Sequence, residues 1–383
     1  MIAALSNRAD YASLAQATYL NQASLGLTPA PAVAAMHAYL DSVGQHGNLH
    51  LSDADELALL TPLREAASQL FNCPPAQLAI VSGASELLSQ LPYLLRLPRG
   101  GHVLCTDGDF PALTRPWLAL ATRSDTTVRF VAESADQDLT DTLINQLDKH
   151  TAVLAVSHVQ FSTGSRVDVP RLRDATRANG TQLVVDVTQS AGALPIDTTA
   201  WDADAVVSSG YKWLGGQGGV GLAVLSPTLA RQTPAMPGWM GAPDPFDTQP
   251  TQLALADGAQ RFTQSTMSYS AVTGLAVTVS ELNRLGATAI EHHASQLSRY
   301  LYETLNSSQW TAFRAPSDRA AAPHIVSLAH PNAKAASVVT RLRQAGVVCS
   351  ARQGRVRVSL AHYNTDTDIN TLVSALCAAS QCN

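Results

Sequence analysis

The chain has 383 residues, of which 46% are hydrophobic and 14% charged, and its formal net charge is −5. The length allows two domains, and the composition is ordinary for a globular enzyme. The negative charge and the lack of an apolar run of membrane-spanning length predict a protein that binds neither nucleic acid nor a membrane. Five cysteines, at positions 73, 105, 349, 377 and 382, show no paired or metal-binding spacing, which predicts reduced thiols and a cytoplasmic location.

Over the first 260 residues, helical patterns alternate with short apolar runs. Helical spacing of apolar residues occurs over 31–43, 62–71, 86–96 and 171–178, and strand-like runs lie near residues 78, 102, 127, 152, 182, 203 and 220. Short strands separated by helices predict an α/β fold, with a mostly parallel sheet covered by helices on both faces. The ligand crevice of such a sheet lies at the carboxyl ends of its strands.

A segment rich in proline and glycine, residues 231–247, interrupts this alternation and predicts a loop. Its Trp239 and Phe246 either cover a pocket or a partner subunit, or belong to an ordinary surface connection. Helical patterns follow over 271–284, 287–305, 335–345 and from residue 366, with strand-like runs HIVSLA, VVCS and RVRVSL between them. We therefore expect an N-terminal arm at 1–18, a large ligand-binding domain at 19–265 and a smaller α+β domain at 266–383.

The stretch from residue 184 to 221 holds an acid and a base at the ends of two apolar runs. In VVDVTQSAG the first run delivers Asp186 and Gln189, and in AVVSSGYKWLGGQGG the second delivers Ser209, Tyr211 and Lys212. A lysine and a carboxylate in these places suit pyridoxal phosphate, whose aldehyde binds a lysine as a Schiff base and whose ring nitrogen binds an acid. Taken alone, Lys212 is also explained as a solvated surface residue and Asp186 as a helix N-cap.

The segment VSGASELLSQL combines a strand end, Gly83, the hydroxyl of Ser85 and the start of a helix. Free backbone N–H groups and the helix dipole favour an anion at such a place, so the segment is a candidate phosphate site. The same pattern also suits an ordinary capping device at the start of a helix.

Six segments occur in the order that is typical of one superfamily of pyridoxal phosphate enzymes: YLNQASLG, SGASE, SHVQFSTG, VVDVTQSAG, SSGYKWLGG and RVRVSLAHYNT. The chain resembles the class V aminotransferase superfamily over about residues 19–368. This branch of the fold-type I enzymes includes cysteine desulfurases, kynureninases and isopenicillin N epimerase-like proteins. The resemblance implies a pyridoxal 5'-phosphate cofactor and an amino-acid substrate.

The resemblance also implies a role for each matching residue. Lys212 would form the Schiff base, Asp186 would pair with the pyridine nitrogen and Gln189 would bind the ring hydroxyl. Phe110, in DGDFPALTRPW, would stack on the ring, although a plain core position also explains it. The groups that would hold the phosphate are the backbone of Ala84 and the side chains of Ser85, Ser209 and Tyr211.

Thr266, in RFTQSTMS, matches a threonine that in relatives reaches the phosphate of the neighbouring subunit. This match implies a homodimer with a shared active site. Ser265 and Met267 stand where relatives usually carry glycine and proline.

Arg357, in RVRVS, matches the arginine that binds the substrate α-carboxylate in the superfamily, and a guanidinium suits that bidentate task. Arg352 and Arg355 are nearby alternatives, one of which we expect to be exposed. Asn21, in YLNQASLG, is a further substrate-binding candidate. Phe161 stands where relatives often carry asparagine, so the substrate pocket here has lost one polar contact.

The reaction depends on groups around the substrate side chain. Desulfurases carry a nucleophilic cysteine on a loop before the carboxylate-binding arginine, whereas Cys349 lies in a strand-like run that favours an inert thiol. We therefore expect a lyase that breaks a Cβ–S, or related Cβ, bond of an L-amino acid. An aminotransferase or an epimerase would use the same residues and stays an alternative, as does a non-enzymatic regulator of the same fold.

Overall fold

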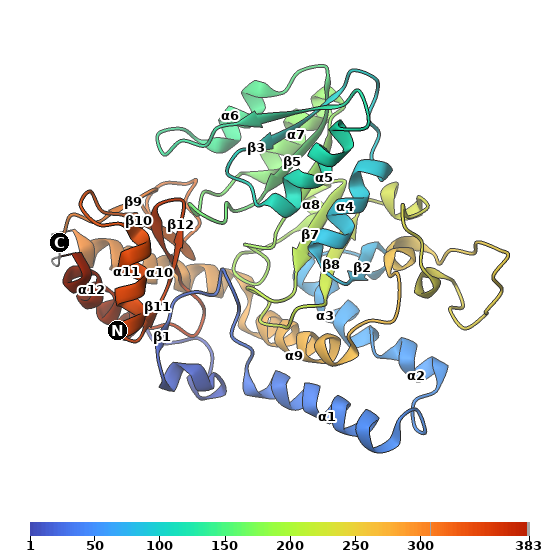
Figure 1. Ribbon diagram of the computed structural model, residues 1–383, viewed down its shortest axis with the longest axis horizontal. Helices are drawn as coiled ribbons and strands as arrows, with labels where there is room; N and C mark the ends of the chain where they lie inside the picture. The colour runs from blue at the N-terminus through green and yellow to red at the C-terminus, as the bar shows by residue number, and fades with distance from the viewer. Residues whose placement is uncertain (307, 381–383) are drawn as a thin grey trace.

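The computed structural model describes residues 1–306 and 308–380, and it forms a larger and a smaller lobe (Figure 1). The larger lobe is built on a seven-stranded sheet with the strand order β2-β8-β7-β6-β5-β3-β4. Its strands are β2 (Leu78–Val81), β3 (His102–Thr106), β4 (Thr127–Val131), β5 (Thr151–Ser157), β6 (Gln182–Asp186), β7 (Ala205–Ser209) and β8 (Gly221–Leu225). Only β8 runs against its two neighbours, so the mostly parallel sheet is confirmed.

The helices of this lobe cover both faces of the sheet, as the alternation of elements predicts. They are α1 (Ala30–His46), α2 (Asp53–Ala58), α3 (Thr61–Phe71), α4 (Ala84–Leu94), α5 (Pro111–Ala121), α6 (Leu139–Gln146), α7 (Val169–Asn179), α8 (Thr198–Trp201) and α9 (Tyr269–Leu285). Short 3-10 helices lie at Arg8–Asp10, Ala12–Ala15, Pro75–Gln77, Leu229–Arg231, Trp239–Gly241 and Gly258–Phe262.

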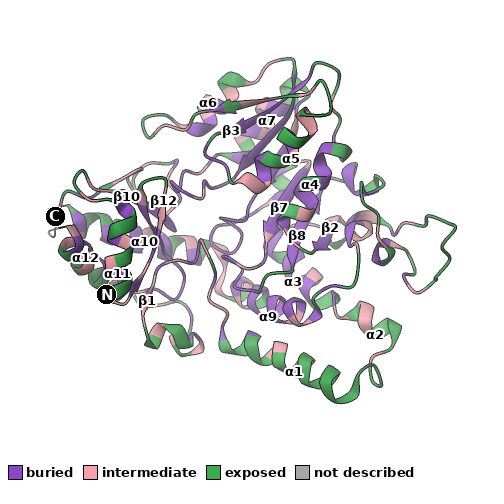
Figure 2. Ribbon diagram, viewed as in Figure 1, coloured by how far each residue is buried: buried purple, intermediate pink, exposed green. Residues whose placement is uncertain are grey.

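Successive side chains of the buried strands point to opposite faces, and each face has its own core. In β5, Val153 and Ala155 pack with α4 and α5, whereas Leu154 and Val156 pack with α3, α6, α7 and α9. Figure 2 shows these strands buried, while α1 and α2 expose most of their residues. The continuous apolar runs in the sequence therefore reflect a sheet that is covered on both sides.

The smaller lobe holds a four-stranded antiparallel sheet with the order β12-β13-β10-β9. Its elements are α10 (Ala287–Leu305), β9 (Thr311–Ala312), β10 (Ile325–Ala329), α11 (Ala335–Gln344), β11 (Val347–Val348), β12 (Ser350–Arg352), β13 (Arg355–Ser359) and α12 (Asp366–Ser380). The N-terminal strand β1 (Thr18–Tyr19) pairs with β11. Helix α9, which lies beyond the expected boundary at residue 265, packs into the core of the larger lobe; the three-part division of the chain stays a prediction.

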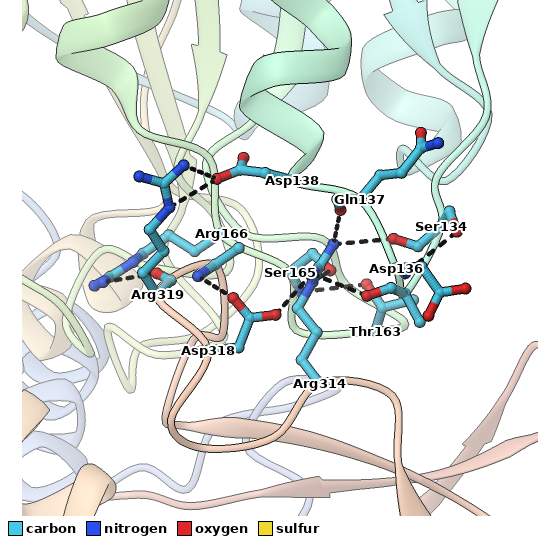
Figure 3. A network of polar contacts seen from close by, with 12 residues as sticks. Ser134, Asp136, Gln137, Asp138, Thr163, Ser165, Arg166, Arg314, Asp318 and Arg319 are labelled. Carbon is cyan, nitrogen blue, oxygen red and sulfur yellow. Dashed lines mark hydrogen bonds and ion pairs between the residues drawn. The ribbon is translucent and has the colours of Figure 1, made fainter.

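Arg314, which follows β9, links the two lobes (Figure 3). Its buried guanidinium donates to the carbonyl oxygens of Ser134 at 3.1 Å and Gln137 at 2.7 Å, both in the loop that follows β4. Asp318 forms an ion pair with the same guanidinium at 2.8 Å. Nearby, Arg319 forms an ion pair with Asp138 across the same junction. These contacts fix the smaller lobe against the carboxyl edge of the large sheet.

Within the described residues, no helix is both long enough and apolar enough to cross a bilayer. The cytoplasmic location stays a prediction.

Candidate active site

The sequence-predicted ligand residues meet at the carboxyl edge of the large sheet. Asp186 ends β6, Ser209 ends β7, and Phe110 stands between β3 and α5. Because β2 and β7 both run against β8, the end of β2 faces the same edge. A cavity lies there. It is lined by Ala84, Ser85, Phe110, Ala112, Ser157, Phe161, Asp186, Thr188, Gln189, Ser209, Tyr211 and Lys212.

Lys212 is a buried lysine whose amine faces an aromatic ring. Its Nζ lies 5.1 Å from the centroid of the Phe110 ring. Burial lowers the pKa of Lys212 from 10.5 to about 8; the charge of Asp186 opposes the shift, and that of Arg357 adds to it. The lowered pKa leaves a usable fraction of neutral amine near neutral pH, which is what a nucleophile and a proton acceptor require. The solvated-lysine alternative is therefore wrong.

Asp186 is buried beside this lysine. The backbone N–H of Thr188 donates to Asp186 Oδ1 at 2.8 Å, and no helix begins there, so the N-cap alternative is wrong as well. Burial raises the pKa of the Asp186 carboxyl, while the bonds from Thr188 and the charge of Lys212 oppose the shift. A buried carboxylate with so little compensation favours a cationic partner, such as a protonated pyridine nitrogen.

Gln189 is held by two hydrogen bonds in a defined orientation. Its Oε1 accepts from the indole of Trp213 at 2.8 Å, and its Nε2 donates to the carbonyl oxygen of Ala23 at 3.0 Å. The amide nitrogen carries a second N–H, which remains for a ligand in the cavity. This geometry suits a donor to a ring oxygen.

The first turn of α4 contributes Ala84 and Ser85 to the lining of the cavity, together with Ser209 and Tyr211. A Cβ atom on Gly221 would lie 2.8 Å from the Cα atom of Gly83, so only glycine lets β8 approach the start of this helix. The helix dipole and the free N–H groups of a first turn favour an anion. The N-cap of α4 is Gly83, which makes no side-chain capping bond; Glu86 instead accepts from the backbone of Ser82, one residue before the cap, at 2.7 Å.

Arg357 lies outside the lining of this cavity, in β13 of the smaller lobe. It is 1% exposed, and it donates to the carbonyl oxygen of Phe161 at 2.7 Å and to Ser24 Oγ at 2.6 Å. Its Nε has no partner in the described structure. Burial, then the charge of Arg352, lowers the pKa of Arg357 to about 9. Both bonded partners of Arg357 are neutral oxygen atoms, so its charge is left for an anion.

The remaining candidates take different positions. Arg352 and Arg355 are both half-buried, so the expectation that one is exposed is wrong. Asn21 is half-buried, and its Oδ1 has no hydrogen-bond partner among the described residues. Thr266 is exposed and does not line the cavity of its own chain.

Three further lining residues were not singled out as ligands from the sequence: Ala112, Ser157 and Thr188. Thr188 Oγ1 accepts from the backbone of Ser209 at 3.1 Å, which joins the ends of β6 and β7. The placement of Ser157 at a strand end, two strands from Lys212, is the signal that marks it. Thr188 thus connects the segment that carries Asp186 with the segment that carries Lys212.

The residues present fit pyridoxal phosphate. A buried lysine of lowered pKa, a buried carboxylate with little compensation and a helix start are arranged around one cavity, as the aldehyde, the ring nitrogen and the phosphate of this cofactor require.

Comparisons with known proteins also point to a pyridoxal phosphate enzyme. The aminotransferase class-V family model matches residues 18–372. YcbU, an uncharacterized aminotransferase of Bacillus subtilis, is 28% identical, covering 82% of this chain and 82% of its own. A cysteine desulfurase of Salmonella agona is 25% identical, and the alignment covers 94% of this chain and 92% of the relative.

Two solved structures share the fold. The cystine C-S lyase C-DES in complex with its product cysteine persulfide is 24% identical, with a TM-score of 0.87 over 96% of this chain and 98% of that chain. A C-DES mutant with glycine covalently linked to its PLP cofactor is 23% identical, with a TM-score of 0.88 over 97% of this chain and 99% of that chain. Because the family match spans nearly the whole chain and the cavity fits the cofactor, this chain belongs to the class-V aminotransferase family and is a pyridoxal-phosphate-dependent enzyme.

Proposed function

We propose that the enzyme eliminates a sulfur group from the β-carbon of an L-amino acid. The observation that carries this proposal is the aromatic wall of the cavity: the rings of Phe110 and Phe161 meet edge to face, with centroids 5.4 Å apart, beside Lys212. An apolar wall suits a soft, polarisable sulfur substituent. It offers no acid to a leaving group, and a thiolate leaves without one because its pKa is low.

The chain's own residues supply the remaining steps. Pyridoxal phosphate, when bound, supplies an aldehyde for the substrate amine and a ring that accepts electrons from the α-carbon. Lys212 Nζ takes the α-proton, the electron pair forms the Cα–Cβ double bond, and the Cβ–S bond breaks with its electrons on sulfur. Hydrolysis of the three-carbon fragment gives pyruvate and ammonia. Asp186 holds the positive charge of the ring, and Arg357 orients the substrate carboxylate.

A persulfide-forming desulfurase is less well supported, although relatives carry that activity in their names. Cys349 is 4% exposed, and burial raises the pKa of its thiol to about 12. No cysteine of the described residues lines the cavity, and Cys382 lies outside them. The described residues therefore offer no thiolate nucleophile in the cavity.

Incubation of the holoenzyme with L-cystine, L-cysteine and S-alkyl cysteines tests the proposal. Pyruvate and ammonia released in equal amounts would support it. Alanine with a protein-bound persulfide would identify a desulfurase instead. The similarity to a protein named as an aminotransferase favours a second candidate, transamination. Conversion of the amino acid to its keto acid, with the amino group passed to an added keto acid, would establish that reaction.

We also infer a homodimer that shares its active sites. Thr266 is exposed and outside its own cavity, as a residue that serves a neighbouring subunit would be. Light scattering should give twice the chain mass, and Thr266→Ala should weaken cofactor retention without changing that mass. A monomer that retains full activity would contradict the inference.

A further inference from the structure

The hydroxyl of Ser24 lies between two arginines from the smaller lobe. Arg357 donates to Ser24 Oγ at 2.6 Å, and Arg352, on the neighbouring strand β12, donates to the same atom at 3.2 Å. Two guanidinium groups that share one neutral oxygen repel each other, and their mutual repulsion is one cause of the lowered pKa of Arg357. Ser24 therefore holds two like charges side by side without neutralising either one.

The O–H of Ser24 is a hydrogen-bond donor without an acceptor among the described residues. A hydroxyl oxygen accepts two hydrogen bonds and donates one, and both acceptor positions of Ser24 are used by the two arginines. No acceptor for the Ser24 O–H is found among residues 1–306 and 308–380. The Nε of Arg357 is also without a partner there. The Ser24 O–H and the Nε–H of Arg357 are thus two donors without a partner among the described residues, beside two cationic groups, and such a place suits a carboxylate.

Ser24 is also tied to the cofactor groups through its own chain segment. We call residues 20–26 the N-terminal strap. The carbonyl oxygen of Ala23 accepts from Gln189 Nε2 at 3.0 Å, and Gln22 Nε2 donates to the carbonyl oxygen of Lys212 at 3.0 Å. From the smaller lobe, Ser359 Oγ accepts from the backbone of Ala23 at 3.2 Å. The strap therefore places Ser24 at a fixed position relative to Lys212 and to Arg357 at once.

We propose that Ser24 is a substrate-recognition residue that donates its hydroxyl proton to the α-carboxylate and aligns Arg357 and Arg352 for the same group. The inference rests on the proposed function, in which Arg357 binds that carboxylate. It assigns to the strap a direct part in recognition of the substrate. Because the hydroxyl contributes to substrate binding rather than to proton transfer, its loss raises KM more than it lowers kcat.

The test compares Ser24→Ala with Ser24→Thr in the holoenzyme, with β-chloro-L-alanine as the substrate probe. Ser24→Ala should raise KM about tenfold, the loss of one hydrogen bond to a charged group, and change kcat by less than about twofold. Ser24→Thr should restore KM because it keeps the hydroxyl. Ser13→Ala, which removes an exposed hydroxyl from the same N-terminal region, should have no effect.

Two measurements separate recognition from a structural role. The inhibition constant of propionate, a carboxylate without an amine, should rise by a similar factor in Ser24→Ala. The KM for β-chloro-L-alaninamide, which has no carboxylate, should not change, and the absorption spectrum of the bound cofactor should stay as in the parent enzyme. Equal losses with the acid and the amide would overturn the proposal.

The outcome for Arg357→Ala distinguishes the two levels of inference. If Arg357→Ala raises KM for the acid and Ser24→Ala does not, the Ser24 inference fails and the carboxylate role of Arg357 stands. If Arg357→Ala leaves KM unchanged, that role itself is wrong, and the Ser24 inference falls with it. Should Ser24→Ala not fold, Ser24→Cys replaces it: a raised KM supports the proposal and an unchanged KM overturns it.

Discussion

A Cβ atom on Gly26 would lie 2.0 Å from the carbonyl oxygen of Lys212. The backbone N–H of Gly26 also donates to the carbonyl oxygen of Tyr211 at 2.9 Å. The N-terminal strap therefore lies directly on the backbone that carries the cofactor lysine, and glycine is required at position 26 by space rather than by backbone torsion. Any larger residue must push the strap away from Lys212.

Gly26→Ala should destabilise the holoenzyme by roughly 1–3 kcal/mol or more and weaken cofactor retention, because backbone atoms must move to relieve the overlap. Thermal unfolding and the cofactor absorbance after gel filtration would measure both effects. Gly44→Ala is the matched control, since Gly44 lies in exposed α1 and its added Cβ would meet nothing within 4 Å. The control should be neutral or slightly stabilising. Equal behaviour of the two variants would contradict the packing argument.

The amine of Lys212 should titrate well below an ordinary lysine in the cofactor-free protein. Its folded-state pKa of about 8 lies under the value of 10.5 for the free side chain. The contribution of this group to stability is therefore fully present above about pH 10.5 and is lost as the pH falls through about 8. The chain has only three lysines, at 149, 212 and 334, so peptide mapping after pulse labelling with an amine reagent resolves each one.

Labelling of Lys212 should reach half of its maximal rate near pH 8. Lys149 and Lys334 are exposed and serve as internal references in the same sample. A Lys212 profile that follows both references would show that burial does not perturb this amine.

Arg314→Ala should lower the free energy of unfolding by about 2–4 kcal/mol, because the change removes a buried guanidinium together with its bonds to Ser134 and Gln137 and its ion pair with Asp318. Denaturant titration measures this loss. Arg314→Lys keeps the charge but not the five N–H donors of the guanidinium. Its free energy of unfolding should therefore lie between those of the parent enzyme and Arg314→Ala. Arg99→Ala breaks an ion pair with Asp125 on the surface and should change stability little. A loss in Arg314→Ala no larger than in this control would mean that the lobes are held together elsewhere.

Cys349→Ala should leave the rate of pyruvate formation within about twofold of the parent enzyme. The thiol is buried, and the high pKa that burial imposes keeps it protonated at neutral pH. The released sulfur and the pyruvate would be assayed in parallel. If a folded Cys349→Ala variant no longer released sulfur, Cys349 would be the nucleophile that attacks the substrate sulfur, and the enzyme would be a desulfurase.

Local patterns in the sequence were sufficient for most elements of the fold. The apolar runs near 78, 102, 127, 152, 182, 203 and 220 correspond to β2–β8, and the helical pattern over 287–305 matches α10. Helices α5 and α6 are not among the predicted helices. Pro111 stands in the first turn, where a missing N–H costs nothing, and packing of Leu113 and Trp117 offsets the bond lost at Pro116.

The sequence by itself determined that Asp186, Gln189 and Lys212 meet at one place, because each follows a strand end and the strand ends of a parallel sheet share one edge. Only the tertiary structure decided what surrounds them. Gln22 contacts the backbone of Lys212 across 190 residues of chain, and Ser24 meets an arginine 333 residues away. Such contacts leave no periodic trace, since they depend on how two lobes and one strap pack together rather than on the spacing of residues along a strand or a helix.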